Sequence, residues 1–382
     1  MPALLGCSME MSAMRFVLVA TFCASFTIAV ILVPLVRAAA TKWGLMAHPG
    51  GRRKHRVALP LGGGIAVFLA CCLPVLAAGV LSYLWRHDQS LFSVPPSLQD
   101  DVLRASSRLP VLLLVLAGGL AVAIFGLVDD ARNLRPRTKL LGQFIIAGAV
   151  SLVPDVRISL FIPSPWVHVV LTSVWIVLMM NSFNLLDNMD GQSGLVALLT
   201  GGVLLVLALQ TGQYFIAGLL LALMGSVLGF LLFNLPPASV FMGDAGAMFI
   251  GYVLAIATTL TTFVTGTRVN PLFPLLVPLV IFAMPLYDVL SVVAIRLHKG
   301  RPLLEGDRSH VSHRLMRLGM SDRMVLLTVG LMVLATSPGA TIPYGSATWQ
   351  IVVPAAQAAA VILVIILLEL AIAPRSNHEE EP

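Results

Sequence analysis

Eleven apolar runs recur along this 382-residue chain, and they limit its fold more than any other feature. A run of about 20 apolar residues is long enough to cross a bilayer as a helix. We therefore predict an all-α integral membrane protein with about eleven transmembrane helices, or ten if the short fourth run does not cross. The runs lie at residues 15–36, 61–84, 109–128, 139–153, 166–183, 193–209, 214–233, 244–263, 272–296, 324–341 and 350–373.

The composition supports this prediction. Apolar residues make up 58% of the chain and charged residues 11%, whereas about a quarter of a soluble domain is charged. A net charge of +6 would suggest nucleic acid in a soluble protein. Here the Lys and Arg residues lie in loops between apolar runs, so we expect a lipid bilayer and no nucleic acid as the partner.

No linker divides the chain, so we predict a single polytopic domain (1–382) with its core at 15–330 and a short tail at 374–382. The first apolar run is longer than that of a typical signal peptide, and no clear cleavage site follows it. We interpret this run as the first membrane helix. Either Met1 or Met14 could be the start of the protein.

The basic residues predict the orientation. Loops after the first, third, fifth, seventh and ninth runs, with the C-terminus, hold 18 of the 24 Lys and Arg residues, and the other side holds 6. By the positive-inside rule the first side is cytoplasmic, and the N-terminus is outside. The ninth run is expected to be kinked or broken, because it contains Pro274, Pro278 and Pro285.

Asp129 and Asp130 end the third run. Adjacent carboxylates at a membrane boundary are costly unless they are hydrated, paired or metal-bound, and such a pair suits a general base. The basic loop that follows, up to Lys139, suggests an anionic substrate nearby. The alternative is a polar helix end that only caps this loop.

A second polar segment, from Asn181 to Gly191, follows the fifth run. If the helix continues here, Asn184, Asp187 and Asp190 recur every three residues and lie near one face. Their oxygens are hard ligands of the kind that Mg²⁺ accepts. An Asx-rich turn between two spans is the alternative, and Gly191 would let the backbone turn away.

Two further motifs follow the seventh and ninth runs. Asp244, in a Gly-Asp-Ala-Gly turn, could cap the next helix or present a carboxylate to a metal. His310, His313 and Arg314 could hold phosphate by charge-assisted hydrogen bonds, and no third ligand at zinc spacing lies nearby. Such a loop could also be no more than a solvated basic segment.

A fifth segment, with Arg52 and His55, precedes a glycine-rich helix start and fits phosphate or anionic lipid headgroups, unless it only sets the topology. Every one of these motifs is predicted to lie on the cytoplasmic side. Together they offer carboxylates for a divalent metal, a base and several cations at membrane depth. Metal-assisted transfer of a phosphoryl or phosphosugar group onto a lipid phosphate fits these parts.

The motifs resemble those of a known family. The sequences GLVDDARNLRPRTKLLGQ (126–143), NSFNLLDNMDG (181–191), VFMGDAG (240–246) and DRSHVSHRL (307–315) are similar, in this order, to the polyprenyl-phosphate N-acetylhexosamine-1-phosphate transferases, a glycosyltransferase 4 type. The resemblance covers about residues 15–330. The chain resembles the bacterial branch that moves GlcNAc-1-phosphate from UDP-GlcNAc to undecaprenyl phosphate.

The resemblance implies a role for each motif. Asp129 would deprotonate the lipid phosphate with Asp130 beside it, and Asn184 and Asp244 would bind Mg²⁺, with Mn²⁺ as a substitute. Asp187 would be a further catalytic acid. The substrate-binding residues would be Asp190, Lys139, His310, His313, Arg314, Arg52 and His55.

The implied products are a lipid diphosphate sugar and UMP, made in the bacterial inner membrane as the first membrane step of a cell-envelope polysaccharide, with a homodimer plausible. The sugar, the pathway (lipopolysaccharide O-antigen, teichoic acid or another) and a covalent intermediate stay open. In one departure, Ser312 stands where the family often has His, which leaves the sugar preference open.

Two rival functions use the same features. A transporter or flippase of lipid-linked or anionic solutes would place acids in the middle of its spans and show an inverted repeat. A non-catalytic membrane scaffold would give no reason for polar motifs to gather on one side. The acids here lie at span ends, and no repeat is visible.

Overall fold

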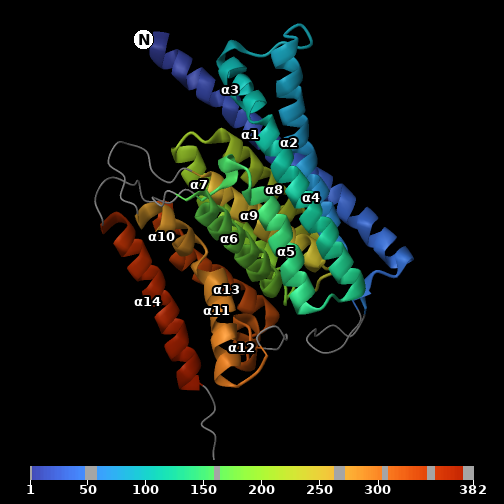
Figure 1. Cartoon of the computed structure of the whole chain (residues 1–382), viewed down its shortest axis with the longest axis vertical. Helices are drawn as coiled ribbons and strands as arrows, with labels where there is room; N and C mark the ends of the chain where they lie inside the picture. Colours follow the sequence, from blue (N-terminus) through green and yellow to red (C-terminus); the bar gives the residue numbers. More distant parts are fainter. Residues whose placement is uncertain are drawn as a thin grey trace, which may run out of the picture.

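The computed structural model describes residues 2–47, 58–158, 164–261, 272–302, 309–341 and 349–372, and these are almost entirely helical (Figure 1). The helices are α1 (Pro2–Trp43), α2 (Gly63–His87), α3 (Pro96–Ser107), α4 (Leu109–Arg132), α5 (Pro136–Ser151), η1 (Pro154–Val156), α6 (Pro165–Leu186), α7 (Gln192–Gln210), α8 (Tyr214–Asn234), α9 (Gly243–Leu260), α10 (Leu272–Ile281), α11 (Ala283–His298), α12 (Val311–Arg317), α13 (Asp322–Thr336), η2 (Pro338–Thr341) and α14 (Trp349–Ile372). A two-residue antiparallel ribbon, β1 (Met46–Ala47) with β2 (Leu59–Pro60), is the one exception in this part of the chain.

Nine helices within the described residues are long and apolar enough to cross a membrane: α1, α2, α4, α6, α7, α8, α9, α13 with η2, and α14. Each of them matches a predicted run, so the protein is a multi-pass membrane protein. The fourth run forms α5, which has only 16 residues and is shorter than the roughly 20 that span a bilayer. The total of eleven spans and the orientation stay predictions.

The ninth run is broken, as expected from its prolines. It forms α10 and α11, and the break falls at Phe282. Pro278 lies inside α10, and Pro285 lies in the first turn of α11, where proline is tolerated. The break gives α11 an axis of its own, beside α12 and α13 (Figure 1).

Helix α9 is the centre of the bundle. It packs against α2, α4, α6, α7 and α8, and 83% of its most apolar window is buried, compared with 17% for α14. Its mean hydropathy is nevertheless the lower of the two, 1.4 against 2.4. A helix surrounded by protein needs less apolar surface than one that faces lipid, so the burial accounts for this difference.

Glycines let two other helices approach the start of α9. A Cβ atom on Gly126 of α4 would lie 2.4 Å from the Cα atom of Ala245. One on Gly64 of α2 would lie 2.2 Å from the backbone nitrogen of Gly246. Small residues at a helix crossing allow this backbone-to-backbone contact in membranes. The first turn of α9 is therefore held directly by α2 and α4.

We expect Gly126→Ala to destabilise the protein by about 1–3 kcal/mol, because the new methyl group would meet backbone that cannot move aside as a side chain can. Thermal unfolding of the purified protein in detergent measures this effect. Gly148→Ala is the matched control on α5, since nothing lies within 4 Å of its added Cβ. An equal effect of the two substitutions would contradict the close contact.

Candidate active site

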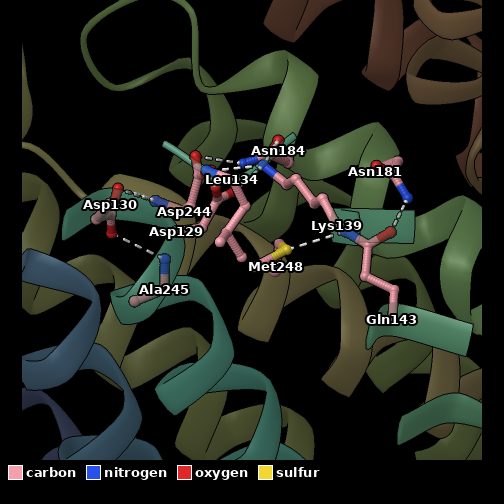
Figure 2. Close-up of polar contacts among 10 residues, drawn as sticks. All are labelled: Asp129, Asp130, Leu134, Lys139, Gln143, Asn181, Asn184, Asp244, Ala245 and Met248. Carbon is pink, nitrogen blue, oxygen red and sulfur yellow. Dashed lines mark hydrogen bonds and ion pairs between the residues drawn. The ribbon is translucent and has the colours of Figure 1, made fainter. Parts of the chain in front are cut away.

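Side chains from the first three polar motifs meet in one cluster, although these motifs lie far apart in the sequence (Figure 2). Asp129 and Asp130 lie in the last turn of α4, and Lys139 lies in the first turn of α5. Asn184 lies in the last turn of α6, and Asp244 in the first turn of α9. The predicted convergence of the first three motifs is thus confirmed.

Lys139 is the hub of this cluster. Its Nζ atom lies 2.7 Å from Oδ2 of Asp129 and 2.5 Å from Oδ2 of Asp244. It also donates to Oδ1 of Asn184 at 3.0 Å, and the Asn184 amide donates to Oδ1 of Asp244 at 2.7 Å. The Asp129 side chain is only 6% exposed. A carboxylate buried to this extent is costly unless it is paired, and the ammonium provides that pairing.

The adjacent carboxylates Asp129 and Asp130 have different partners. Asp129 faces Lys139, and its Oδ1 accepts the backbone N–H of Leu134 at 2.9 Å. Asp130 accepts the backbone N–H groups of Asp244 at 2.9 Å and Ala245 at 3.2 Å. Asp130 therefore caps the start of α9 from another helix, where unpaired N–H groups and the helix dipole favour an anion.

This cap corrects the interpretation of the Gly-Asp-Ala-Gly turn. Asp244 is not the N-cap of α9, because it lies within the first turn and Met242 occupies the cap position. The space beside Gly243 is filled by the Asp130 carboxylate, whose Oδ2 would lie 2.6 Å from a Cβ atom at position 243.

The fifth-run helix does not continue through the whole second motif, and the alternative of a turn after it is confirmed. Helix α6 ends at Leu186, with Asp187 as its C-cap, so Asp187 and Asp190 do not share a helical face with Asn184. They lie in the turn that follows, which Gly191 ends with a φ of +75°, as its predicted role in turning the chain requires. One short segment therefore leads from the Lys139 cluster into a neighbouring cavity.

This cavity has a volume of about 490 Å³. Acidic and amide side chains line one part of it, and His313 and Arg323 bring positive or ionisable groups. Its lining residues are Asp187, Asn188, Met189, Asp190, Asn234, Pro236, Pro237, Phe241, His313, Met316, Ser321, Asp322 and Arg323. A volume of this size, with an aromatic ring and several polar groups, is typical of a small-molecule site.

Asn234 is a site residue that the motifs did not reveal. Its Oδ1 accepts the N–H of Gly191 at 2.9 Å, and its Nδ2 donates to the carbonyl of Val240 at 2.9 Å. Asp190 acts in the same way, since its Oδ2 accepts the N–H of Ala238 at 2.9 Å. The two side chains fasten the second motif to the third. The sequence signal that could have indicated Asn234 is its place as a single polar residue directly after the seventh apolar run.

Residues of the last motif contact two different parts of the structure, the cavity and helix α11. His313 lines the cavity, and Ser312 donates to Oδ1 of Asn188 at 2.6 Å. Arg314 turns to α11, where it donates to the Ser291 hydroxyl at 2.7 Å and lies 5.6 Å from the centre of the Tyr287 ring. The cavity therefore joins this motif to the second one.

His310 is not among the residues that line the cavity, and it pairs with Asp288 of α11. Arg52 and His55 lie outside the described residues. The described chain that follows them does reach the site, since the N–H of Phe241 donates to the Pro60 carbonyl at 3.0 Å and that of Gly63 donates to the Phe241 carbonyl at 3.0 Å.

The cluster suits a hard divalent cation. The described ranges contain no group of three or more His, Cys, Asp or Glu residues that could hold a metal. Mg²⁺ does not require such a group, because one or two carboxylates with phosphate and water commonly suffice. Carboxylate and amide oxygens of Asp129, Asn184 and Asp244 already surround one cation, the Lys139 ammonium. Their chemistry therefore fits Mg²⁺.

Comparison with known proteins gives a consistent result. A model described as glycosyl transferase family 4 matches residues 112–262, which contain the first three motifs. The chain is 28% identical over 339 residues to a probable undecaprenyl-phosphate N-acetylglucosaminyl 1-phosphate transferase of Bacillus subtilis, covering 87% of this chain and 86% of the relative.

Two other relatives have similar names. A decaprenyl-phosphate N-acetylglucosaminephosphotransferase of Mycolicibacterium smegmatis is 29% identical over 359 residues, covering 87% of this chain and 84% of the relative. An undecaprenyl-phosphate alpha-N-acetylglucosaminyl 1-phosphate transferase of Yersinia pestis is 27% identical over 317 residues, covering 79% and 78%.

We expect Asp130→Ala to lower the free energy of unfolding by about 1–3 kcal/mol, because it leaves two poorly hydrated N–H groups of α9 without an acceptor. Asp130→Asn keeps one acceptor oxygen and should have a smaller effect. Thermal unfolding in detergent measures both. The control is Asp155→Ala, which removes an exposed ion pair with Arg108 and should change stability by less than about 0.5 kcal/mol. A neutral Asp130→Ala would contradict the cap.

Proposed function

We propose the following reaction for this chain, whose residues 112–262 match the model of glycosyl transferase family 4 and whose relatives are named as transferases. It transfers an N-acetylhexosamine 1-phosphate, with GlcNAc 1-phosphate as the expected group, from a UDP-sugar to undecaprenyl phosphate. UMP is released. The reaction takes place at the cytoplasmic face of the bacterial inner membrane, as the first membrane step of a cell-envelope polysaccharide.

The observation that carries this proposal is the Lys139 cluster beside the cavity. A UDP-sugar needs a cavity for its nucleoside and sugar, and its diphosphate needs cations. The cavity offers the Phe241 ring as an apolar surface for a base, and carboxylates at Asp187 and Asp190 as acceptors for hydroxyl groups. Asp187 lines the cavity, and Asn184, three residues earlier, binds Lys139. A diphosphate that extends from the cavity toward Asn184 would therefore meet Lys139.

In the proposed reaction, an oxygen of undecaprenyl phosphate attacks the phosphorus that bears the sugar. The bond from this phosphorus to the oxygen that links the two phosphates of the donor breaks, and UMP leaves with that oxygen. Asp129 accepts the proton of the lipid phosphate, if that group arrives protonated. Before this proton transfer, Lys139 pairs with phosphate oxygens in place of the Asp129 carboxylate, which leaves that carboxylate free to act as the base.

Asn184 and Asp244 would hold Mg²⁺, with Mn²⁺ as a substitute. When bound, the ion would offset the negative charge of the diphosphate. Asp130 contributes indirectly, because it fixes the backbone that carries Asp244. A transporter is less favoured by this arrangement, since the acidic side chains of the cluster lie in the terminal turns of their helices and surround a closed ion pair.

Purified protein with Mg²⁺, undecaprenyl phosphate and a panel of UDP-N-acetylhexosamines should release UMP. We expect Asp129→Asn and Asp244→Ala each to lower kcat/KM by at least about 100-fold, which is typical for the loss of a base or an electrostatic contact. Thermal unfolding should change little for Asp129→Asn. Asp155→Ala should keep full activity. Folded protein that releases no UMP with any donor would refute the function.

A second experiment concerns the cation. Because the Lys139 ammonium lies among the proposed metal ligands, Lys139→Met should raise the affinity of the substrate-free protein for Mn²⁺ at least about tenfold, equal to about 1.4 kcal/mol, while it lowers transfer. Titration of Mn²⁺ followed by electron paramagnetic resonance measures the affinity. Arg135→Gln removes an exposed, solvent-screened charge near the start of α5 and is the control. Equal affinities in all three proteins would contradict competition by Lys139.

A further inference from the structure

A buried carboxylate outside the Lys139 cluster holds the last motif in place. Asp288 of α11 is completely buried. Its Oδ2 lies 2.8 Å from Nδ1 of His310, and its Oδ1 accepts the backbone N–H of Val311 at 2.7 Å. His310 is itself 4% exposed. Both oxygens of Asp288 are thus used by consecutive residues of one segment, at the point where α12 begins.

The hydrogen bond determines how His310 can interact. A carboxylate only accepts hydrogen bonds, so the hydrogen lies on Nδ1 of the imidazole. Nε2 is then the nitrogen that remains for another partner, and the ring is held in one orientation. A carboxylate that orients a histidine in this way is a common supporting contact in functional sites.

The same face of α11 holds the rest of the motif. Tyr287 and Asp288 are consecutive and Ser291 lies one turn later on this helix, and all three contact the segment around α12. Asp288 binds His310 and Val311, while the other two contact Arg314. The His310 ring in turn lies 6.5 Å from that of His313, which lines the cavity. Helix α11 therefore supports the segment that forms one edge of the cavity.

The break in the ninth run makes this support possible. Phe282, at the break, packs edge-on against the rings of Trp175 at 6.1 Å and Phe183 at 6.3 Å, measured between ring centres. The hydroxyl of Ser337 donates to the Ile281 carbonyl at 2.7 Å, where the end of α10 would otherwise lack a helical partner. These contacts fix the start of α11 and, five residues later, the position of Asp288.

We propose that Asp288 is a positioning residue for the transfer reaction. It holds the His310 ring in one orientation, with Nδ1–H donated to the Asp288 carboxylate and Nε2 left for a second partner at the edge of the cavity. This inference rests on the proposed function of the site. Asp288 does not touch the substrate, and its effect on catalysis passes through His310.

The test is a double-mutant cycle on UMP release. Asp288→Asn keeps the shape of the side chain but presents an N–H group to one of its two donors, so the His310 ring loses its orientation. We expect kcat/KM to fall about 100-fold, the size of effect that misplacement of a catalytic group produces, with most of the loss in kcat. In a His310→Ala background the same substitution should change kcat/KM less than threefold, because the group it positions is gone.

Several outcomes would overturn the proposal. It fails if Asp288→Asn has wild-type activity, or if its effect is equally large with and without His310. Ser291→Ala is the control on the same face of α11, and it should leave the coupling between positions 288 and 310 unchanged. If Asp288→Asn does not fold, Asp288→Glu is measured instead, and loss of folded protein in both would make Asp288 a folding residue only.

The proposed function is tested separately by the unsubstituted protein. If that protein releases no UMP with any donor, the reaction itself is refuted. If it releases UMP and the cycle shows no coupling, the reaction stands and only the role of Asp288 is refuted.

Discussion

The capping of α9 by Asp130 is the interaction on which the site depends. Two N–H groups at the start of α9 bind the carboxylate of a residue from α4, and glycines at positions 64 and 126 bring α2 and α4 close enough for this contact. The same turn of α9 carries Asp244. Because the cap fixes the backbone of this turn, it also fixes where Asp244 can meet Lys139 and Asn184, which come from two other helices.

Much of the fold could be predicted from the sequence, because a long apolar run predicts a membrane helix directly. The broken ninth run and the meeting of the first three motifs could also be predicted. The different partners of Asp129 and Asp130 could not be predicted, since Asp130 binds backbone N–H groups more than a hundred positions away. Asp288 was missed for a similar reason: one acid within an apolar run does not reveal a contact with a histidine that caps a later helix.

The ion pairs of Lys139 explain how a membrane protein can keep a cluster of carboxylates ready for a charged substrate. Without a cation, the buried Asp129 and its neighbour Asp244 would repel each other at high cost in a poorly hydrated place. The ammonium offsets this cost by pairing with both carboxylates. A flexible lysine side chain can also move to a phosphate without any change in the helices.

The contact between Ser312 and Asn188 has an evolutionary consequence. The hydroxyl reaches the amide oxygen at 2.6 Å from a completely buried position, so an imidazole in place of Ser312 would need space that Asn188 now fills. The two positions should therefore vary together among homologues, with a smaller residue at 188 wherever a histidine occupies 312. Substitution of either one alone would leave an unpaired polar group or a steric clash beside the cavity.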